Sequence, residues 1–310
     1  MTITLPAALT PGQPISVVIP TFDRGSVLPR AVRSVLAQTI TRLDFVVVDD
    51  GSTDDTAKVL AEMADPRMRI VRQEHLGVCR ARNLGARHAS APLLAFLDSD
   101  DEASAFWLER LSAPFADPAV GIACCGFTLH TAGGTEERRD PAPLGPAFDG
   151  QPGPYLAGTF MVRRDLFAEV GGYDEELTYS ENTELALRLI PACLARGLAI
   201  RAVPEPLVDL HSNRPPGFDR RALELGLASS ERVLARHDAR LARDRRVYAL
   251  FHATAGVRAA RLGELACART HFLTAVRAQP ANWRHAARLL LASCPPLGAL
   301  VWGRVAADER

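Results

Sequence analysis

Short apolar runs alternate with amphipathic helical patterns over the first hundred residues of this 310-residue chain. The apolar runs lie at residues 15–19, 45–48, 69–71 and 93–97, and each is too short to be a helix. Between the first two, residues 27–38 place their apolar side chains on one helical face. Strands that alternate with helices in this way build a mostly parallel sheet flanked by helices. The sequence therefore predicts an α/β fold with a Rossmann-like central sheet.

Polar residues directly follow three of these predicted strands. Thr21 follows the first, Asp50 follows the second, and residues 98–101 follow the fourth. Ligands of parallel sheets bind beyond the carboxyl ends of the strands, near the switch in strand order, so we expect these residues to share one edge. Such an edge indicates a nucleotide site. The chain has neither a GxGxxG loop nor a P-loop, which disfavours an ordinary dinucleotide or ATP site.

The acidic turn after the fourth strand is the candidate metal site. Asp98, Asp100 and Asp101 place three carboxylates within four residues. Clustered carboxylates raise one another's pKa unless a cation compensates, and oxygen ligands on a short turn suit Mg²⁺ or Mn²⁺. The alternative is an acidic loop whose Asp side chains cap a helix that starts near Ala103.

Six short segments carry a further pattern, and they occur in a fixed order. They are residues 16–24 (SVVIPTFDR), 34–39 (SVLAQT), 48–56 (VDDGSTDDT), 81–85 (ARNLG), 96–101 (FLDSDD) and 171–175 (GGYDE). Together, over about residues 15–212, they resemble the family-2 glycosyltransferases of the GT-A fold. The resemblance implies a nucleotide-sugar donor, often a UDP-sugar, and inversion at the anomeric carbon with Mn²⁺ or Mg²⁺ as cofactor. The implied acceptor is a hydroxyl of a glycan, a lipid-linked sugar or a small molecule.

The resemblance also implies roles for individual residues. It implies a nucleoside pocket, a base contact at Asp50, a diphosphate contact at Arg82 and a ribose-side contact in a DxD motif. The residues implied to bind the nucleotide are Pro20, Thr21, Asp23, Asp50, Arg82, Asp98 and Ser99. The residues implied to hold the metal are Asp100, Asp101 and His211. Arg80 is close enough in sequence to compete with Arg82, and a hydrogen-bonded loop histidine is the alternative for His211.

The acceptor side departs from the family pattern. Relatives commonly carry Glu-Asp-x-Asp there, with the second residue acting as base, whereas this chain reads ENTE at residues 181–184. An amide cannot take up a proton at neutral pH, so we expect Glu181 to be the general base and Asn182 to bind sugar hydroxyls. The alternatives are a different mechanism, including retention of configuration, an inactive homologue, and a Glu181 that only stabilises a helix N-terminus.

The chain changes character near residue 216, where a helical pattern rich in Arg, Ala and Leu begins. Five residues then follow the spacing of the second half of a tetratricopeptide unit: Gly263, Ala268, Phe272, Ala275 and Pro280. One such unit cannot form a solenoid, so we expect a helical appendage. The predicted divisions are an N-terminal arm at 1–14, a GT-A domain at 15–216 and the appendage at 217–310.

Charge and cysteine content bound the partners and the compartment. Residues 220–310 hold 16 Arg against 7 acidic residues, from which we expect a solvated face that docks on the acidic rest of the chain, and no nucleic-acid partner. The six cysteines lack CxxC pairing, which predicts a cytoplasmic protein with neither a disulfide framework nor a zinc site. No signal sequence or membrane span is expected. For residues 283–304, peripheral contact with the inner face of the membrane, core packing and a homodimer contact stay open.

Two other functions are compatible with such a sheet. A nucleotidyltransferase that makes nucleotide sugars would carry a glycine-rich loop with Arg and Lys after the first strand, but this chain reads PTFDR at residues 20–24. A catalytically weak or inactive homologue that binds nucleotide as a scaffold is favoured by Asn182 and the helical appendage. Sugar transfer in the presence of Mn²⁺ distinguishes the enzyme from the scaffold.

Overall fold

The computed structural model describes residues 13–131, 133–212, 219–294 and 302. The chain divides into two compact units. The first comprises Met1–Leu144, Phe148–Glu175 and Glu181–Arg214, and the second comprises Gly145–Ala147, Glu176–Ser180 and Pro215–Arg310. Nearly all of the predicted N-terminal arm and the predicted boundary near residue 216 lie outside the described residues, so those limits stay predictions.

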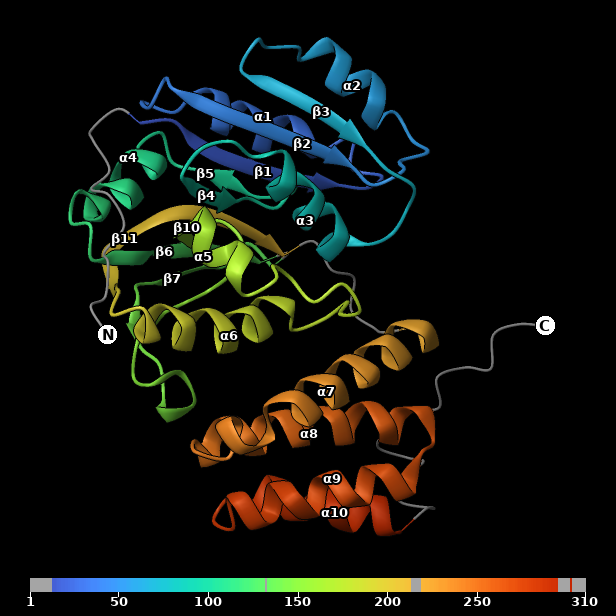
Figure 1. Ribbon diagram of the computed structural model, residues 1–310. Coiled ribbons are helices and arrows are strands. Elements are labelled where there is room, and N and C mark those ends of the chain that lie inside the picture. The colour runs from blue at the N-terminus through green and yellow to red at the C-terminus, as the bar shows by residue number, and fades with distance from the viewer. Residues whose placement is uncertain (1–12, 132, 213–218, 295–301, 303–310) are drawn as a thin grey trace. The chain divides into compact units, whose positions relative to one another are not determined.

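The first unit is built on a nine-stranded sheet, shown in Figure 1. The strand order is β3-β2-β1-β4-β10-β6-β11-β5, and β7 pairs with β6. Its first four strands in the chain pair in parallel: β1 (Ile15–Thr21), β2 (Leu43–Asp49), β3 (Met68–Arg72) and β4 (Leu93–Phe96). The predicted α/β fold with a mostly parallel, Rossmann-like sheet is therefore confirmed.

The other half of the sheet contains both parallel and antiparallel pairs. β10 (Phe160–Arg163) is antiparallel to both β4 and β6 (Val120–Thr131), while β11 (Ala199–Ser212) runs parallel to β6. The shorter strands are β5 (Glu102–Ala103) and β7 (Glu136–Arg139), and β8 (Ala142–Pro143) pairs with β9 (Pro152–Gly153) in a separate ribbon. The switch in direction at β10 lies beside β4, the strand that leads into the acidic turn.

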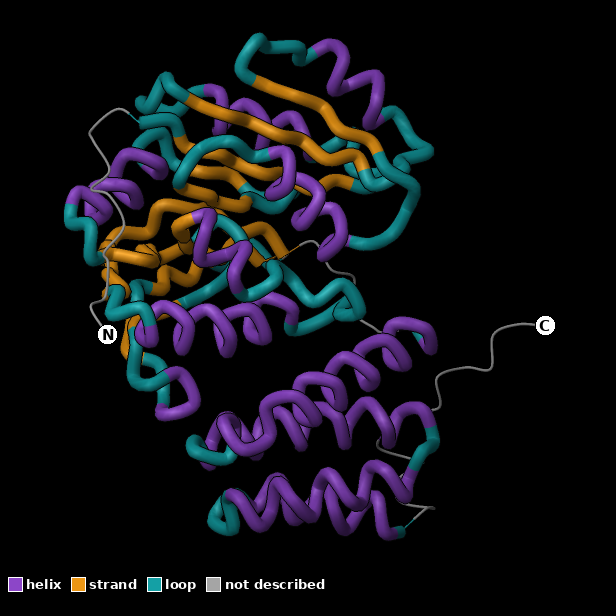
Figure 2. Tube along the Cα trace, in the orientation of Figure 1, coloured by secondary structure: helices purple, strands orange, loops and turns teal. Residues whose placement is uncertain are grey.

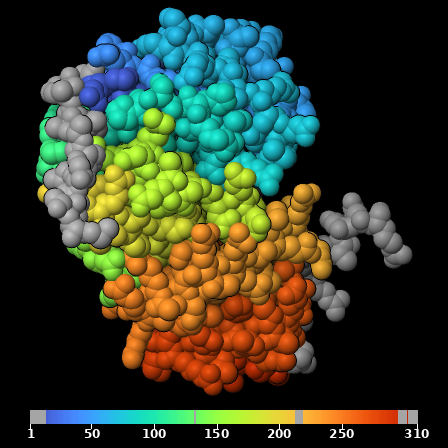
Figure 3. All heavy atoms as spheres, viewed as in Figure 1, coloured from blue at the N-terminus to red at the C-terminus, as the bar shows by residue number. Residues whose placement is uncertain are grey.

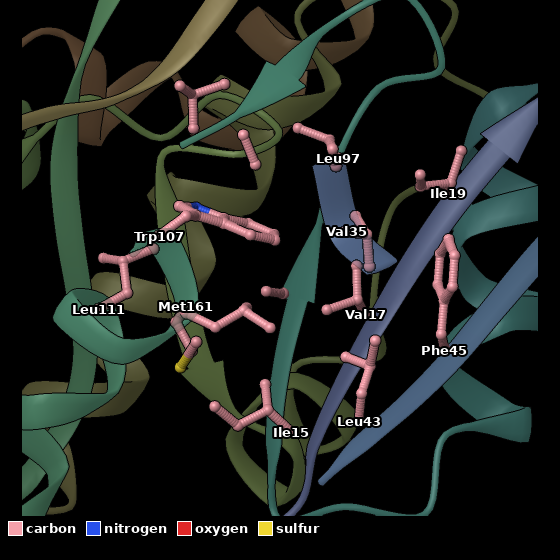
Figure 4. Packing of buried hydrophobic residues seen from close by; sticks show 14 of the residues in the cluster. Ile15, Val17, Ile19, Val35, Leu43, Phe45, Leu97, Trp107, Leu111 and Met161 are labelled. Atoms are coloured by element: carbon pink, nitrogen blue, oxygen red, sulfur yellow. The ribbon is translucent and has the colours of Figure 1, made fainter. Parts of the chain in front are cut away.

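The core on one face of the sheet is formed by alternate residues of β1 and β2. Since successive side chains of a strand point to opposite faces, Ile15, Val17 and Ile19 all reach the same side. There they pack with α1 (Leu28–Leu36) and α4 (Trp107–Ser112), as Figure 4 shows for Val35 and Trp107. Burying one large apolar side chain contributes about 1.5–3 kcal/mol. This cluster therefore anchors the strands that carry the site.

Helix α3 (Val78–His88) covers the opposite face at close range. A Cβ atom on Gly85 would collide with a γ-methyl group of Val18 and would approach Val48 at 3.2 Å. Only glycine allows the helix to lie this close to β1 and β2. The remaining helices of the unit are α2 (Thr56–Glu62), α5 (Arg164–Glu169), α6 (Glu181–Ala195) and a 3₁₀ turn at Ala113–Ala116.

The secondary structure in the described part of the second unit is helical, as the colouring of Figure 2 shows. They are α7 (Arg220–Leu241), α8 (Arg245–Leu262), α9 (Leu265–Ala278), α10 (Trp283–Ser293) and a 3₁₀ turn at Pro146–Phe148 that begins in this unit. In the space-filling view of Figure 3 the orange-to-red atoms of α7 to α10 form one continuous body. The predicted helical region is confirmed, whereas its likeness to a tetratricopeptide unit stays a prediction.

Helix ends and a close helix crossing define this second unit. Asp219, Asp244 and Asn282 each accept a backbone N–H of the helix that follows, which satisfies groups that a helix start leaves unpaired. Gly256 of α8 lies against the ring of Phe272 in α9, where a Cβ would approach the ring at 2.6 Å.

Among the described helices, none combines the length and apolar character needed to cross a bilayer.

Candidate active site

The carboxyl ends of β1, β2 and β4 meet at one edge of the sheet, as expected. The N–H of Asp50 donates to the carbonyl of Thr21 at 2.8 Å, and the N–H of Leu97 donates to the carbonyl of Val18 at 3.1 Å. Pro20 is buried near the end of β1. The hydroxyl oxygen of Thr21 is buried and has no hydrogen-bond partner among the described residues. A buried polar atom without a partner is a natural contact for a ligand at this edge.

Asp50 shapes the loop between β3 and α3. Its Oδ1 accepts the N–H of Leu76 at 2.9 Å, and its Oδ2 accepts the N–H of Gly77 at 2.9 Å. The side chain of Gln73 donates to Oδ1, and the ring of His75 lies 3.0 Å from Oδ2. Both carboxylate oxygens thus bind the loop itself. The base contact of Asp50 stays a prediction. In the structure, its carboxylate holds the loop between β3 and α3.

Two aromatic rings that sequence reasoning missed lie at the same edge. The ring of Phe22 stacks on that of His75 with 3.7 Å between centroids and an angle of 22° between planes. Phe22 is 36% exposed although it is a large apolar side chain. Phe22 lies within residues 16–24, one of the six segments that resemble the family, whereas His75 lies outside all six. The pair offers a flat apolar surface on which a planar ring can stack.

Asp23 connects the loops that follow β1 and β2. Its Oδ1 accepts the backbone N–H of Thr53 at 2.7 Å and that of Asp54 at 3.3 Å, while its own N–H donates to Ser52. The φ angle of Asp23 is +48°, in the left-handed region that non-glycine residues rarely adopt. The carboxylate therefore holds a strained turn in place at this edge of the sheet.

The acidic turn lies between β4 and β5. The alternative, in which its Asp residues cap a helix near Ala103, is wrong, because Glu102–Ala103 forms β5, which pairs with β11, and α4 begins only at Trp107. Ser99 is buried in this turn. Asp100 pairs with Arg24 at 3.1 Å, and Arg30 donates to the carbonyl of Asp100.

Asp101 and His211 are brought together, as the metal prediction requires. The backbone N–H of His211, at the end of β11, donates to Oδ1 of Asp101 at 2.9 Å. Burial, and after it the charges of Asp98 and Asp100, raise the pKa of Asp101 to about 8. The Nε2 atom of His211 is buried without a partner among the described residues. Burial, followed by the charge of Arg30, lowers the pKa of His211, which keeps the ring neutral and able to coordinate a metal.

These groups fit a divalent cation by their chemistry. Three carboxylates lie within four residues of this turn, and the backbone N–H of His211 contacts Asp101, the last of them. Burial, and after it the charges of Asp98 and Asp100, raises the pKa of Asp101. Oxygen-rich sets of this kind suit Mg²⁺ and Mn²⁺. The roles of Asp100, Asp101 and His211 as ligands stay predictions.

Arg82 is the buried cation of the site. Its Nη2 donates to Oδ1 of Asp98 at 2.6 Å, its Nη1 donates to Oε1 of Glu181 at 3.2 Å, and its guanidinium lies 5.0 Å from the ring centre of Tyr173. Burial opposes the charged form, but Asp98 and the groups around it hold the pKa of Arg82 well above its usual value. Arg80, the competing candidate, instead pairs at the surface with Glu175.

Glu181 and Asn182 open helix α6 and face the same group of residues. Asn182 donates from Nδ2 to Oε1 of Glu181 at 3.1 Å and accepts the hydroxyl of Tyr173 at 3.0 Å. The bonds from Arg82 and Asn182 to Glu181 therefore both fall on Oε1. Ser180, immediately before them, has a φ angle of +62°, and such strain concentrates at functional sites.

Tyr173 is a positioning residue that sequence reasoning missed. Asn83 holds it through two bonds, since its Nδ2 donates to the Tyr173 carbonyl at 2.9 Å and its Oδ1 accepts the Tyr173 N–H at 2.8 Å. Asn83 and Tyr173 both lie in recognised segments, but nothing in the sequence shows that segments 90 residues apart pair in this way. Asn83 therefore fixes Tyr173, whose ring lies against Arg82 and whose hydroxyl donates to Asn182.

The chain resembles a known protein family over about half of its length. Residues 16–171 match the profile described as Glycosyl transferase family 2. Validoxylamine A glucosyltransferase of Streptomyces hygroscopicus subsp. jinggangensis (strain 5008) is 44% identical over 129 residues, which cover 39% of this chain and 31% of the relative. The chain thus spans about a third of the length of the first curated relatives it matches.

Solved structures share the fold at low sequence identity. A crystal structure of S. aureus TarS, residues 1–349, aligns with a TM-score of 0.60 at 18% identity, covering 92% of this chain and 86% of that one. Mannosyltransferase PcManGT from Pyrobaculum calidifontis, in complex with GDP-Man and Mn²⁺, aligns with a TM-score of 0.53 at 20% identity, covering 92% and 80%. At these identities the likeness shows a common GT-A fold.

Proposed function

Because this chain belongs to glycosyl transferase family 2, we propose that it transfers a sugar from a nucleotide-sugar donor to an acceptor hydroxyl. A UDP-sugar is the favoured donor, Mn²⁺ or Mg²⁺ the cofactor and inversion the favoured outcome. The acceptor is a glycan, a lipid-linked sugar or a small molecule. The observation that carries the proposal is the buried Arg82, which joins the acidic turn at Asp98 to the acceptor-side carboxylate of Glu181.

The nucleoside is proposed to bind at the ends of β1 and β2. The unpaired hydroxyl of Thr21 and the exposed Phe22–His75 ring pair supply a polar contact and a stacking surface there. Asp23 and Asp50 hold the two loops that border this pocket. The structure of TarS with UDP-GlcNAc and that of PcManGT with GDP-Man support a nucleotide-sugar donor, although each describes its own protein.

The diphosphate is proposed to bind next to the acidic turn. Asp100, Asp101 and His211 would hold the cation, with Asp98 and Ser99 on the ribose side. When bound, a divalent cation offsets the negative charge that grows on the leaving diphosphate. Arg82 contributes a fixed positive charge at the same place, and a preorganised charge is worth more in a buried site than in water.

Glu181 is proposed to remove the proton of the acceptor hydroxyl as it attacks the anomeric carbon. Arg82 and Asn182 both donate to Oε1, so Oε2 is the proposed proton acceptor. Asn182, itself held by the Tyr173 hydroxyl, fixes the rotamer of Glu181.

The experiment that tests this function is donor turnover with Mn²⁺. UDP-, GDP-, CDP- and dTDP-sugars are incubated with the protein, and release of the nucleoside diphosphate is followed with and without metal. We expect turnover of one nucleotide class that needs the metal and is lost in Glu181→Gln. Glu169→Gln is the matched control, because Glu169, in α5, pairs with Arg196 and has no contact with the site residues among its described ion pairs.

The second candidate is a nucleotide-binding scaffold, which the amide at Asn182 favours. A scaffold would be stabilised thermally by a nucleotide through mass action, yet would release no diphosphate from any donor. Nucleotide binding without turnover in every donor class would therefore decide against the enzyme.

A further inference from the structure

Three potential metal ligands converge in the helical unit. Glu231 of α7 and the pair Cys267 and His271 of α9 each offer one ligand atom, and these atoms all lie within 4.8 Å of one another. Cys267 and His271 are four residues apart, so they share one face of their helix. The side chains thus approach a common point from two helices.

Two of the three separations are close to the edges of a coordination tetrahedron. The Sγ atom of Cys267 lies 3.5 Å from Oε1 of Glu231, and Nε2 of His271 lies 3.7 Å from the same oxygen. Zinc binds thiolate sulfur at about 2.3 Å and imidazole or carboxylate atoms at about 2.0–2.2 Å. Tetrahedral geometry with those bond lengths separates neighbouring ligand atoms by roughly 3.4–3.6 Å. The two separations from Oε1 of Glu231 are therefore within a few tenths of an ångström of that geometry, and the third ligand pair lies within 4.8 Å.

His252 of α8 sets the orientation of the His271 ring. The Nδ1 atoms of the two rings lie 2.9 Å apart, so one proton is shared between them. If Nδ1 of His271 donates, its Nε2 carries the lone pair and faces Glu231 and Cys267. Metal-ligating histidines are typically held by just such a bond from the other ring nitrogen.

An ordinary polar cluster is the simpler explanation of Glu231, Cys267 and His271. In the absence of a cation, the Cys267 thiol can donate to Glu231, and a protonated His271 can pair with the same carboxylate. That explanation accounts for two contacts. It does not account for a thiol, an imidazole and a carboxylate all directed at one point, with a fourth side chain that fixes the imidazole. Thiolate, imidazole and carboxylate are the three protein ligand types of zinc.

We propose that Glu231, Cys267 and His271 bind a zinc-type divalent cation, with solvent in the fourth position. The ion would link α7 to α9, and His252 would act from α8 as the positioning residue. An open hollow lined by Glu231, Arg232, Ala235 and Arg236 borders one of the three proposed ligands. The lack of CxxC pairing predicted that the cysteines form no zinc site, and this proposal revises that prediction, since one ligand comes from another helix.

Cobalt spectroscopy on the full chain tests the proposal directly. The protein is stripped of metal with a chelator and titrated with Co²⁺, whose bond to a thiolate gives a charge-transfer absorption that oxygen ligands do not give. We expect this absorption to saturate at one Co²⁺ per chain and to disappear on addition of Zn²⁺. Cys267→Ser should lose it, and Cys294→Ser, which changes an exposed thiol outside the cluster, should keep it.

Two further variants keep the test decisive if Cys267→Ser folds poorly. Glu231 is exposed, so Glu231→Gln should fold, keep the sulfur band and bind Co²⁺ at least tenfold more weakly. His252→Phe should likewise keep the band with about 10–100-fold weaker binding. Absence of the band in the unaltered chain, its persistence in Cys267→Ser, or unchanged affinity in Glu231→Gln would overturn the proposal. Mn²⁺ at the acidic turn gives no such band, so the result does not depend on the transferase function.

Discussion

Arg82 donates a hydrogen bond to Glu181 across 3.2 Å, although the two residues are 99 positions apart in the chain. The same guanidinium pairs with Asp98 at 2.6 Å. One buried cation thus serves the turn that is proposed to bind the donor and the carboxylate that is proposed to activate the acceptor. Removing it would leave two carboxylates close together with no charge to offset them.

Arg82→Met should damage both stability and turnover. Breaking a buried ion pair costs about 3–5 kcal/mol, and the lower end applies here because Asp98 is partly exposed. Turnover should fall about 100-fold or more, since a preorganised charge is lost. Urea unfolding and donor turnover measure the two effects. Arg80→Met is the control, with a stability change within about 1 kcal/mol; equal effects in both variants would contradict the role of Arg82.

Glu181→Gln should separate binding from chemistry. The amide can still accept from Arg82, so donor affinity should stay within about twofold, while turnover should fall about 100- to 10,000-fold with loss of the general base. Nucleotide titration and donor turnover distinguish the two. Asn182→Asp is the matched variant, because its carboxylate can still accept the Tyr173 hydroxyl. Normal turnover in Glu181→Gln would place the base elsewhere, and a gain in Asn182→Asp would point to position 182.

Asp100→Ala should abolish the metal dependence of nucleotide binding. Melting temperatures are measured with UDP, with Mn²⁺ and with both, and only the shift that needs both should be lost. Arg24→Gln removes the partner of Asp100 but leaves the carboxylate, so its metal-dependent shift should remain. An unaltered metal-dependent shift in Asp100→Ala would rule out this residue as a ligand.

Asp101 should make the metal-free protein less stable as the pH rises. Its pKa in the fold is raised to about 8 from the ordinary 3.8, so the folded state binds a proton that the unfolded state has lost. Between about pH 4 and pH 8 the free energy of unfolding should therefore fall with increasing pH. Asp101→Asn can still accept the N–H of His211, and it should flatten this dependence. Urea unfolding at several pH values measures it; equal slopes in both proteins would refute the assignment.

The sheet edge could be predicted because its signals are local. Alternating apolar runs predict parallel strands, and parallel strands bring Thr21, Asp50 and Asp98 to one edge without further information. The expected helix near Ala103 failed for a non-local reason. Residues 102–103 pair with β11, a strand a hundred residues later, and sheet pairing overrode the local capping pattern.

The contacts between distant segments could not be predicted in the same way. Glu181 was singled out from its place in a motif, but its bond to Arg82 depends on how α3 and α6 are placed in the fold. The stacking of Phe22 on His75 depends likewise on the loop that Asp50 holds. In the helical unit, the spacing of Cys267 and His271 is visible in the sequence, whereas the third ligand comes from another helix.

The close packing of α3 on the sheet links the folding of this chain to its proposed activity. Gly85 lies one turn after Arg82, so a side chain at position 85 would lift the helix from Val18 and carry the guanidinium with it. A substitution there would be rejected both by selection for a stable protein and by selection for an active one. A library screened only for folded variants would therefore also be enriched in variants that keep Arg82 in place.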